Sequence, residues 1–464
     1  MGTTTRSPAA PGQTPTRRWQ GDLAVLGVEV ALVVLAAVVG AVLNAHGVGL
    51  HADAAPLYAT WRPHAGWGTP AGVLVAVTVI GSGVRWARVA RWGPLLGVAW
   101  LASAAWTLSL ALIDGWSAGL AERLTVQAEY LHEVPGIRDV PATLAGFAGR
   151  ILDFRPDSWS THTAGHPPGA LLVFVGLDRI GLGGGAAAAL ACVLVGTSVT
   201  VSVPVALRAL GAESAARAVL PFLVLSPGAV WVGASADGLF AGVVAAGLAL
   251  LAVRGRLAPA AGGLVLGFAL YLSYGFVLVG LLALVVLALR PADRVAALLS
   301  AIAGATAVVV AFTAAGFWWW DGYQRVVQRY DQGWAADRPY GYWVWADLAA
   351  LVLSAGPALG PALRQAVRAG LAAIRPALHG PGTRRARSAV AAGPCVLLPV
   401  AAAVVILAAD LSGLSKAEVE RIWLPFAVWL LAAAAHLPAA THRWWLVGQA
   451  ATCLAVNHLL WTVS

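Results

Sequence analysis

Long apolar runs, each about 20 residues and almost free of charge, restrict the fold of this sequence more than any other feature. Hydrophobic residues make up 59% of the 464 residues and charged residues only 11%, against roughly 25% charged residues in soluble globular domains. Runs of this length match the hydrocarbon thickness of a bilayer. The sequence therefore predicts an all-α, polytopic transmembrane helix bundle and argues against a soluble enzyme, a disordered protein or a disulfide-rich secreted domain.

We expect about 13 spans within an integral membrane domain at 21–464. They fall at 23–45, 71–86, 94–113, 186–207, 216–233, 237–253, 258–273, 275–289, 295–316, 342–360, 390–410, 422–438 and 443–462. The segment 167–182 has an apolar part of only about a dozen residues before Asp178 and Arg179. We therefore expect a re-entrant or interfacial helix there.

The arginines set the expected orientation, because cytoplasmic loops are enriched in Lys and Arg. They gather in alternate short loops, above all in a basic loop at 361–388, which we expect to be cytoplasmic with a disordered cytoplasmic tail at 1–20. The C-terminus then lies outside. The net charge of +9 reflects this membrane orientation and not a nucleic-acid partner, since the arginines form no stripe in a polar domain.

The acidic residues concentrate in one expected outside loop, 114–166, which we call the acidic loop. It holds seven of the 21 acidic residues: Asp114, Glu122, Glu129, Glu133, Asp139, Asp153 and Asp157. Its LTVQAEYLHEV stretch has helical spacing, which predicts Glu129 and Glu133 on one side of a helix. Paired acids of this kind are often only a solvated face, but long loops also tend to carry function.

The acidic loop ends in THTAGHPPGALL, where His166 precedes two prolines. Because proline resists helix formation before it, a helix is expected to begin at the prolines with His166 beside its N-terminus. Such an end attracts anions, which suits a phosphate at the membrane surface; a purely structural entry turn is the alternative. Asp237, at the start of another span, is expected either to bind a substrate hydroxyl or to cap its helix.

Two further expected outside loops carry cations: the aromatic loop, 316–343, and the lysine loop, 410–426. Their candidate phosphate-binding residues are Arg325, Arg329, Arg338, Lys416 and Arg421. Arginine is disfavoured on this side of a membrane, and Lys416 is the only lysine of the chain. Guanidinium groups four residues apart on a helix are suited to clamp a phosphate.

These motifs resemble the GT-C superfamily of polytopic glycosyltransferases, in the branch of the protein mannosyltransferases and aminoarabinose transferases. The resemblance rests on AEYLHEV, on HPPG, and on the spans SPGAVWVGASADGLFAGVVAAGLALLAV and GGLVLGFALYLSYGFVLVGLLAL, and covers roughly 94–290. HPPG replaces the HPPL of the family, and no Asp-Glu dipeptide stands in the acidic loop. The Ala-, Gly- and Arg-rich composition is typical of high-GC, actinobacterial coding.

The resemblance implies a sugar donor carried on a polyprenyl phosphate, an outward-facing site in the cell membrane and inversion at the anomeric carbon. It implies an acid of the acidic loop as general base, for which Asp114 and Glu129 both fit and Glu133 is the third catalytic candidate. His166 is expected to position the donor. The acceptor is a glycan, a lipid or a protein. No cofactor is required by the sequence, although the carboxylates are compatible with a divalent metal ion.

Two other functions fit the spans. A transporter or lipid flippase would place charged residues at mid-depth and interrupt its helices; here the expected spans carry little charge and only 271–275 interrupts one strongly. A non-catalytic scaffold would not need clustered acids.

Overall fold

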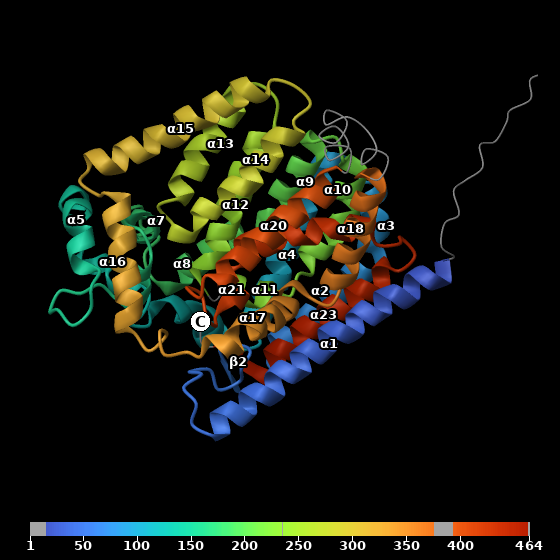
Figure 1. Cartoon of the computed structure of the whole chain (residues 1–464), viewed down its shortest axis with the longest axis horizontal. Coiled ribbons are helices and arrows are strands. Elements are labelled where there is room, and N and C mark those ends of the chain that lie inside the picture. The colour runs from blue at the N-terminus through green and yellow to red at the C-terminus, as the bar shows by residue number, and fades with distance from the viewer. Residues whose placement is uncertain (1–14, 234, 375–392, 463–464) are drawn as a thin grey trace, which may run out of the picture.

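Helices form nearly all of the regular structure, as the apolar runs predict. The computed structural model describes residues 15–233, 235–374 and 393–462 (Figure 1). In the first half of the chain the helices are α1 (Pro15–Ala45), α2 (Gly68–Thr78), α3 (Val84–Val89), α4 (Trp92–Ala111), α5 (Val140–Gly146), α6 (Thr161–Gly165), α7 (Pro168–Arg179), α8 (Gly185–Thr197), α9 (Val199–Ala209), α10 (Glu213–Val224) and α11 (Ala229–Val232). In the second half they are α12 (Ala236–Ala252), α13 (Leu257–Ala269), α14 (Val279–Leu289), α15 (Arg294–Ala314), α16 (Trp319–Gln332), α17 (Tyr340–Ala355), α18 (Leu359–Ile374), α20 (Pro394–Leu411), α21 (Val419–Ile422), α22 (Leu424–Leu430) and α23 (His442–Leu459).

Two short strands, β1 (Ala59–Trp61) and β2 (Leu460–Thr462), pair antiparallel with Thr60 opposite Trp461. They fasten the end of α23 to the segment between α1 and α2 and are the only sheet in the described part of the chain. The all-α prediction is therefore confirmed.

Within the described residues, six helices are long and apolar enough to cross a membrane, or seven if the pair α17 and α18 counts as one broken span. This supports a membrane protein. Most of the other intervals expected as spans contain shorter apolar helices, such as α12 and α13, so the total of 13 spans stays a prediction.

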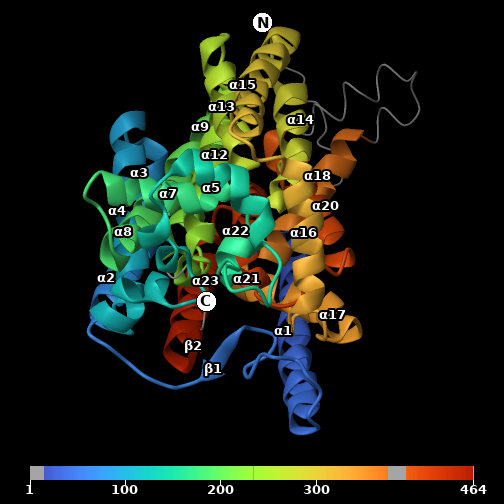
Figure 2. The ribbon, with the colours of Figure 1, turned by 90° about the vertical axis from the view of Figure 1, so that its left-hand side faces the viewer.

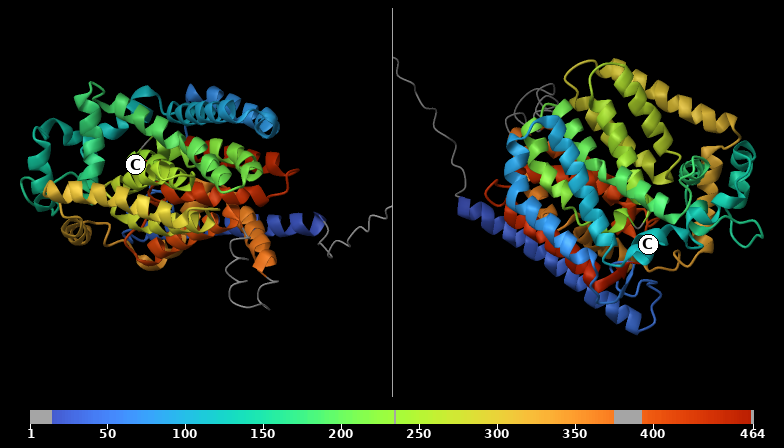
Figure 3. Two further views of the ribbon diagram at one scale, coloured as in Figure 1. Left: turned by 90° about the horizontal axis from the view of Figure 1, so that it is seen from above. Right: turned by 180° about the vertical axis from the view of Figure 1, so that it is seen from behind.

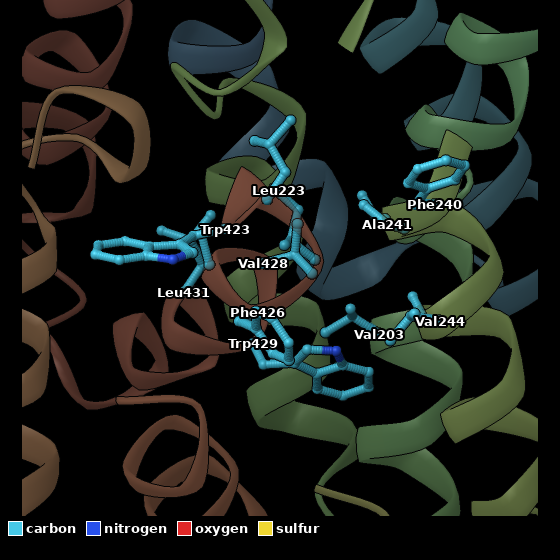
Figure 4. Packing of buried hydrophobic residues seen from close by; sticks show 14 of the residues in the cluster. Val203, Leu223, Phe240, Ala241, Val244, Trp423, Phe426, Val428, Trp429 and Leu431 are labelled. Atoms are coloured by element: carbon cyan, nitrogen blue, oxygen red, sulfur yellow. The ribbon is translucent and has the colours of Figure 1, made fainter. Parts of the chain in front are cut away.

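The helix α12 lies inside the bundle and packs against α8, α9, α13, α14 and α22. Figure 4 shows side chains from three helices at this contact: Val244 of α12 lies beside Val203 of α9, and Phe426 and Trp429 of α22 lie on the other side of Val203. These side chains are almost completely buried. Helix association inside a bilayer depends on such close packing, since lipid tails are as apolar as the side chains.

Several expected boundaries are corrected by the structure. The expected span 342–360 ends earlier, because α17 stops at Ala355, Gly356 has a φ of +89° and α18 then leaves at an angle of 95°. Residues 361–374 of the basic loop are helical within α18, and 375–388 lie outside the described residues. Residues 1–14 of the expected tail also lie outside them, whereas 15–20 already belong to α1. This end of α1 has packing partners, since Trp19 contacts Trp445 and Asp22 binds Arg364.

The helix expected for LTVQAEYLHEV is wrong. Short 3₁₀ turns at Arg123–Thr125, Tyr130–His132 and Val134–Gly136 replace it. Val126 and Glu129 have extended backbones that interrupt any longer helix. Glu129 and Glu133 therefore do not share a helix face. The break allows Leu124, Tyr130 and Val134 all to be buried.

The segments between the membrane helices form two groups: the basic turns, and the acidic loop together with α16. Arg217 donates to the carbonyl oxygens of Ala87 and Ala90, and Arg290 donates to that of Val253 at 2.7 Å, so the basic turns bind one another. The acidic loop and α16 lie at another end, away from the Pro15 end of α1 in both views of Figure 3. Figure 2 faces this end and shows α5, α7 and α16 around α21.

Close packing of α13 against α15 depends on small residues, and this predicts a stability difference. A Cβ on Gly304 would lie 2.2 Å from the carbonyl oxygen of Ala260, whereas one on Gly280 of α14 would meet nothing within 4 Å. We expect Gly304→Ala to lower the free energy of unfolding by about 1–3 kcal/mol through overpacking. Gly280→Ala is expected to be neutral or stabilising by up to about 1 kcal/mol. Unfolding in detergent micelles checks this, and equal effects would contradict the packing described.

Candidate functional site

Arg421 lies at the centre of the polar contacts among the loops at this end. It belongs to the four-residue helix α21, and its side chain is only 7% exposed. Its Nη1 donates to Oδ2 of Asp237 at 2.8 Å. Its Nη2 donates to a carboxylate oxygen of Glu418 and lies 3.3 Å from Nε2 of His162. One side chain thus joins α12, the lysine loop and the acidic loop.

Asp237 lies in the first turn of α12, which begins after an extended Ser235. No side-chain hydrogen bond caps the start of α12, and the expected role of Asp237 in binding a substrate hydroxyl stays a prediction. Its carboxylate instead neutralises Arg421 inside the bundle. Burial alone would lower the pKa of Arg421, but the charges of Glu418 and Asp237 raise it above its ordinary value, so the guanidinium stays charged.

Glu129 and His162 form a buried pair beside Arg421. Oε1 of Glu129 lies 2.8 Å from Nδ1 of His162. Because a guanidinium only donates, Nε2 of His162 accepts from Arg421, and Nδ1–H therefore donates to Glu129. The other oxygen of Glu129, Oε2, is buried and has no hydrogen-bond partner among the described residues. The histidine thus fixes the carboxylate while one oxygen stays able to accept a proton.

His166 lies where the prolines predict it, immediately before α7 begins at Pro168. Its Nδ1 donates to the carbonyl oxygen of His162 at 2.9 Å and lies 2.9 Å from the hydroxyl of Tyr130. Burial lowers the pKa of His166, so the ring stays neutral, and burial raises the pKa of Tyr130. Tyr130 also stacks on Phe174 of α7 at 5.2 Å. His166 therefore anchors the residues that carry Glu129 and His162.

Arg338 and Lys416 extend the network towards the aromatic loop. Nη2 of Arg338 donates to Oε1 of Glu418 at 3.1 Å, and Nη1 donates to the carbonyl oxygen of Lys416 at 2.5 Å. The guanidinium also lies 4.9 Å from the ring of Trp334. Lys416 in turn donates to the carbonyl oxygens of Ala336 and Arg338 at 2.7 and 2.8 Å. The two loops are thereby clasped together, and burial lowers the pKa of the Lys416 ammonium.

Glu418 and Glu420, two acids on either side of the start of α21, have very different pKa values. Burial would raise the pKa of Glu418, but the charges of Arg421 and Arg338 hold it at about 2. Burial raises the pKa of Glu420 to about 7, against the lowering effect of hydrogen bonds that include one from the backbone of Tyr58. Glu418 is therefore a permanent anion, whereas Glu420 titrates near neutral pH.

Four of the expected site residues lie outside this network. Asp114 binds His64 at 2.5 Å and Arg123 at 3.1 Å, next to β2. Glu133 accepts from the backbone of Ser160 at 2.8 Å. The helix expected around Arg325 and Arg329 is present as α16, but these arginines pair separately with Asp321 and Asp153, at 3.0 Å each. The first pair lies within α16 and the second joins α16 to the acidic loop, so the two arginines do not form a joint clamp.

The choice between Asp114 and Glu129 follows from these contacts. Asp114 uses one oxygen on a histidine and the other on an arginine, whereas Glu129 keeps one oxygen without a partner in the described structure. A general base needs such a free oxygen within reach of the proton it takes. Glu129 is therefore the better candidate.

His162 and Glu418 were not singled out by the sequence interpretation. His162 stands four residues before His166 and lies in α6, where its ring contacts Arg421. That i,i+4 histidine spacing was the available signal. For Glu418 the signal was its place three residues before Arg421, a spacing that suits an ion pair on one helical turn.

A surface cavity of about 330 Å³ opens elsewhere on the acidic loop, lined by Arg138, Asp139, Thr143, Arg150 and Trp159, among others. Arg150 lies 3.8 Å from the carboxylate of Glu133.

Within the described ranges, no three His, Cys, Asp or Glu side chains are placed to hold a metal ion. Comparison of the chain with protein-family models, with curated proteins and with solved structures found no match.

The raised pKa of Glu420 predicts a pH-dependent effect of Glu420→Gln. The folded protein holds the Glu420 proton up to pH 7, and an unfolded glutamate releases it near pH 4.3. The wild type therefore loses stability as pH rises through this window, and glutamine does not. We expect the variant to gain up to about 3 kcal/mol relative to wild type between pH 5 and pH 8.

Thermal unfolding in detergent at each pH measures this gain. Glu213→Gln is the control, because Glu213 is 40% exposed. A stability difference for Glu420→Gln that does not change with pH would show that Glu420 is ionised throughout.

Proposed function

We propose that this chain is a membrane glycosyltransferase that moves a sugar from a polyprenyl-phosphate donor to an acceptor outside the cytoplasm, with inversion at the anomeric carbon. The observation that carries the proposal is the Arg421 network. It joins Glu129, whose second carboxylate oxygen has no partner among the described residues, to Arg421 through His162, and it joins Arg421 through Glu418 to Arg338, which contacts Lys416, at one end of an apolar helix bundle. A GT-C-like arrangement of about 13 spans belongs to the same proposal.

The proposed orientation places the N-terminus in the cytoplasm and the acidic loop and the C-terminus outside. The contacts of Arg217 and of Arg290, each with a neighbouring basic turn, support this, because those turns then share the cytoplasmic face, where arginine is enriched. Nucleotide-activated sugars are confined to the cytoplasm. A sugar linked to a membrane lipid is therefore the activated donor on the outer side, and its phosphate lies at the membrane surface.

The chemistry needs one base and several cations. The acceptor oxygen attacks the anomeric carbon, and the bond from that carbon to the phosphate oxygen breaks with its electron pair leaving on the phosphate. Glu129 Oε2 takes the acceptor proton, held in place by the bond from His162 to Oε1. Arg421, Arg338 and Lys416 stabilise the charge that develops on the leaving phosphate.

Separate substitutions of the two candidate acids test this proposal. Glu129→Gln is expected to reduce transfer by about 10²-fold or more, because it removes the base but keeps the accepting oxygen for His162. Asp114→Asn is expected to retain most transfer per folded molecule, since Asp114 binds His64 and Arg123 and lies outside the network. Glu122→Gln, an exposed acid of the same loop, is the matched control.

The assay measures radiolabelled sugar moved from a polyprenyl-phosphate donor in membranes. Full transfer by Glu129→Gln would remove Glu129 from the reaction. Loss of transfer in Asp114→Asn alone would return the role of base to Asp114.

A transporter or lipid flippase is the second candidate, favoured by one specific observation. Oε1 of Glu29 in α1 accepts from the backbone of Gly360 at 2.6 Å, directly after the 95° break between α17 and α18. Interrupted helices with buried charges mark substrate pathways in transporters. Asp347 and Asp410 add buried carboxylates on α17 and α20. Movement of a lipid or solute across reconstituted vesicles, without any sugar transfer, would favour this candidate.

A further inference from the structure

Glu418 bridges the two buried guanidinium groups of the network. One of its carboxylate oxygens accepts from Arg338 at 3.1 Å, and the other accepts from Arg421. A single anion with two oxygens thus fills the space between two cations. Paired guanidinium groups bind phosphate oxygens in the same way, through charge-assisted hydrogen bonds.

The backbone that carries Glu418 is unusual for residues other than glycine. Ala417 and Glu418 have φ angles of +65° and +62°, so two successive residues with side chains are in the left-handed region. This conformation is unfavourable for such residues and persists only where surrounding contacts hold it. Here the contacts that hold it include the ion pairs of the Glu418 side chain. The lysine loop is therefore poised to change conformation when those pairs break.

Glu418 is also the most exposed anion around Arg421. Its side chain is 19% exposed, compared with 8% for Asp237 and 4% for Glu129. Asp237 is fixed in a helix, whereas Glu418 follows the irregular segment 412–417. Of the three acids, Glu418 has the shortest path to water.

We propose that Glu418 occupies the position of the donor phosphate, and that the phosphate of the lipid-linked donor binds between Arg338 and Arg421 by displacing it. This inference rests on the proposed function. Displacement exchanges one anion for another and so keeps the charge of the buried network balanced. A phosphate that entered beside Glu418 would instead meet three carboxylates, those of Glu418, Asp237 and Glu129, in a poorly solvated space.

Both arginines keep other partners when Glu418 leaves. Arg421 remains bound to Asp237 at 2.8 Å, and Arg338 remains bound to the carbonyl oxygen of Lys416 at 2.5 Å. The two guanidinium groups are therefore already in position to bind a phosphate. Until a donor binds, the Glu418 carboxylate occupies the site and neutralises these two buried cations.

The test compares binding of a polyprenyl phosphate to the purified full chain in detergent, for wild type and Glu418→Gln. If the form with Glu418 displaced makes up about a tenth of the wild type, its apparent affinity is about tenfold below the intrinsic value. A neutral glutamine competes less well for the arginines, so we expect about tenfold tighter binding by the variant. Glu213→Gln is the matched control, because Glu213 also bridges two arginines, Arg208 and Arg217, in a basic turn. We expect it to bind as the wild type does.

Equal or weaker binding by a folded Glu418→Gln would overturn the displacement. Inorganic phosphate, tested in parallel, separates the two sources of phosphate: we expect much weaker binding than for the lipid. Equal affinity per phosphate would overturn the assignment to a lipid-linked donor.

A second measurement leaves Glu418 in place, in case its variant does not fold. Oγ of Ser415 is buried, so a Ser415→Cys thiol is expected to react slowly with a maleimide and faster when polyprenyl phosphate moves the segment. The three native cysteines are buried and serve as a silent background. No acceleration would overturn the displacement. If the wild type transfers sugar but neither tighter binding by Glu418→Gln nor faster labelling of Ser415→Cys is seen, only the displacement of Glu418 is rejected. If the wild type neither binds the lipid nor transfers sugar, the proposed function is rejected as well.

Discussion

A buried positive charge at Arg421 determines how the loops of this protein fold over the helix bundle. A guanidinium in a poorly hydrated site needs anionic partners, and removing one partner from such a pair typically costs about 3–5 kcal/mol. No single segment supplies enough partners here. Asp237 comes from α12, Glu418 from the lysine loop, and His162 brings Glu129 from the acidic loop. The requirement for neutralisation therefore brings distant segments to one point.

The helix bundle makes this point rigid. Asp237 is fixed by the start of α12, which is packed on several sides. The residues with Glu129 and His162 are fixed through His166 and through the stacking of Tyr130 on α7. The segment 412–418 is less regular, and its left-handed residues are held partly by the ion pairs of the Glu418 side chain. Well-fixed parts thus carry Glu129 and Asp237, and the irregular segment 412–418 carries Glu418, the anion that we propose is displaced.

The sequence predicted the parts of this arrangement that follow from local chemistry. Apolar runs gave the helices, and the prolines after His166 gave the start of α7. The scarcity of charge singled out Glu129, Asp237, Arg338 and Arg421 before any contact was known. The few charged residues of such a chain are informative because an ionisable side chain inside a membrane protein usually needs a partner that neutralises it or hydrogen-bonds to it.

The pairings could not be predicted, since they depend on tertiary structure. Glu129 and Glu133 have helical spacing, yet burial of Leu124, Tyr130 and Val134 favours short turns. Asp114 and Glu129 were equivalent candidates until His64 and Arg123 were found on the two oxygens of Asp114, whereas one oxygen of Glu129 has no partner among the described residues. The i,i+4 spacing of His162 and His166 does not by itself predict the role of His162, because that role arises from the distance between its ring and Arg421.

Everything proposed for Arg421 requires its end of the bundle to face the outside of the cell. Single cysteines at the exposed positions Asp157, in the acidic loop, and Ser214, in a basic turn, measure this directly with a membrane-impermeant maleimide on intact cells. If the network works on an outer-surface phosphate, Asp157→Cys is labelled in intact cells and Ser214→Cys only after permeabilisation. The reverse pattern would place the network in the cytoplasm and contradict its proposed role.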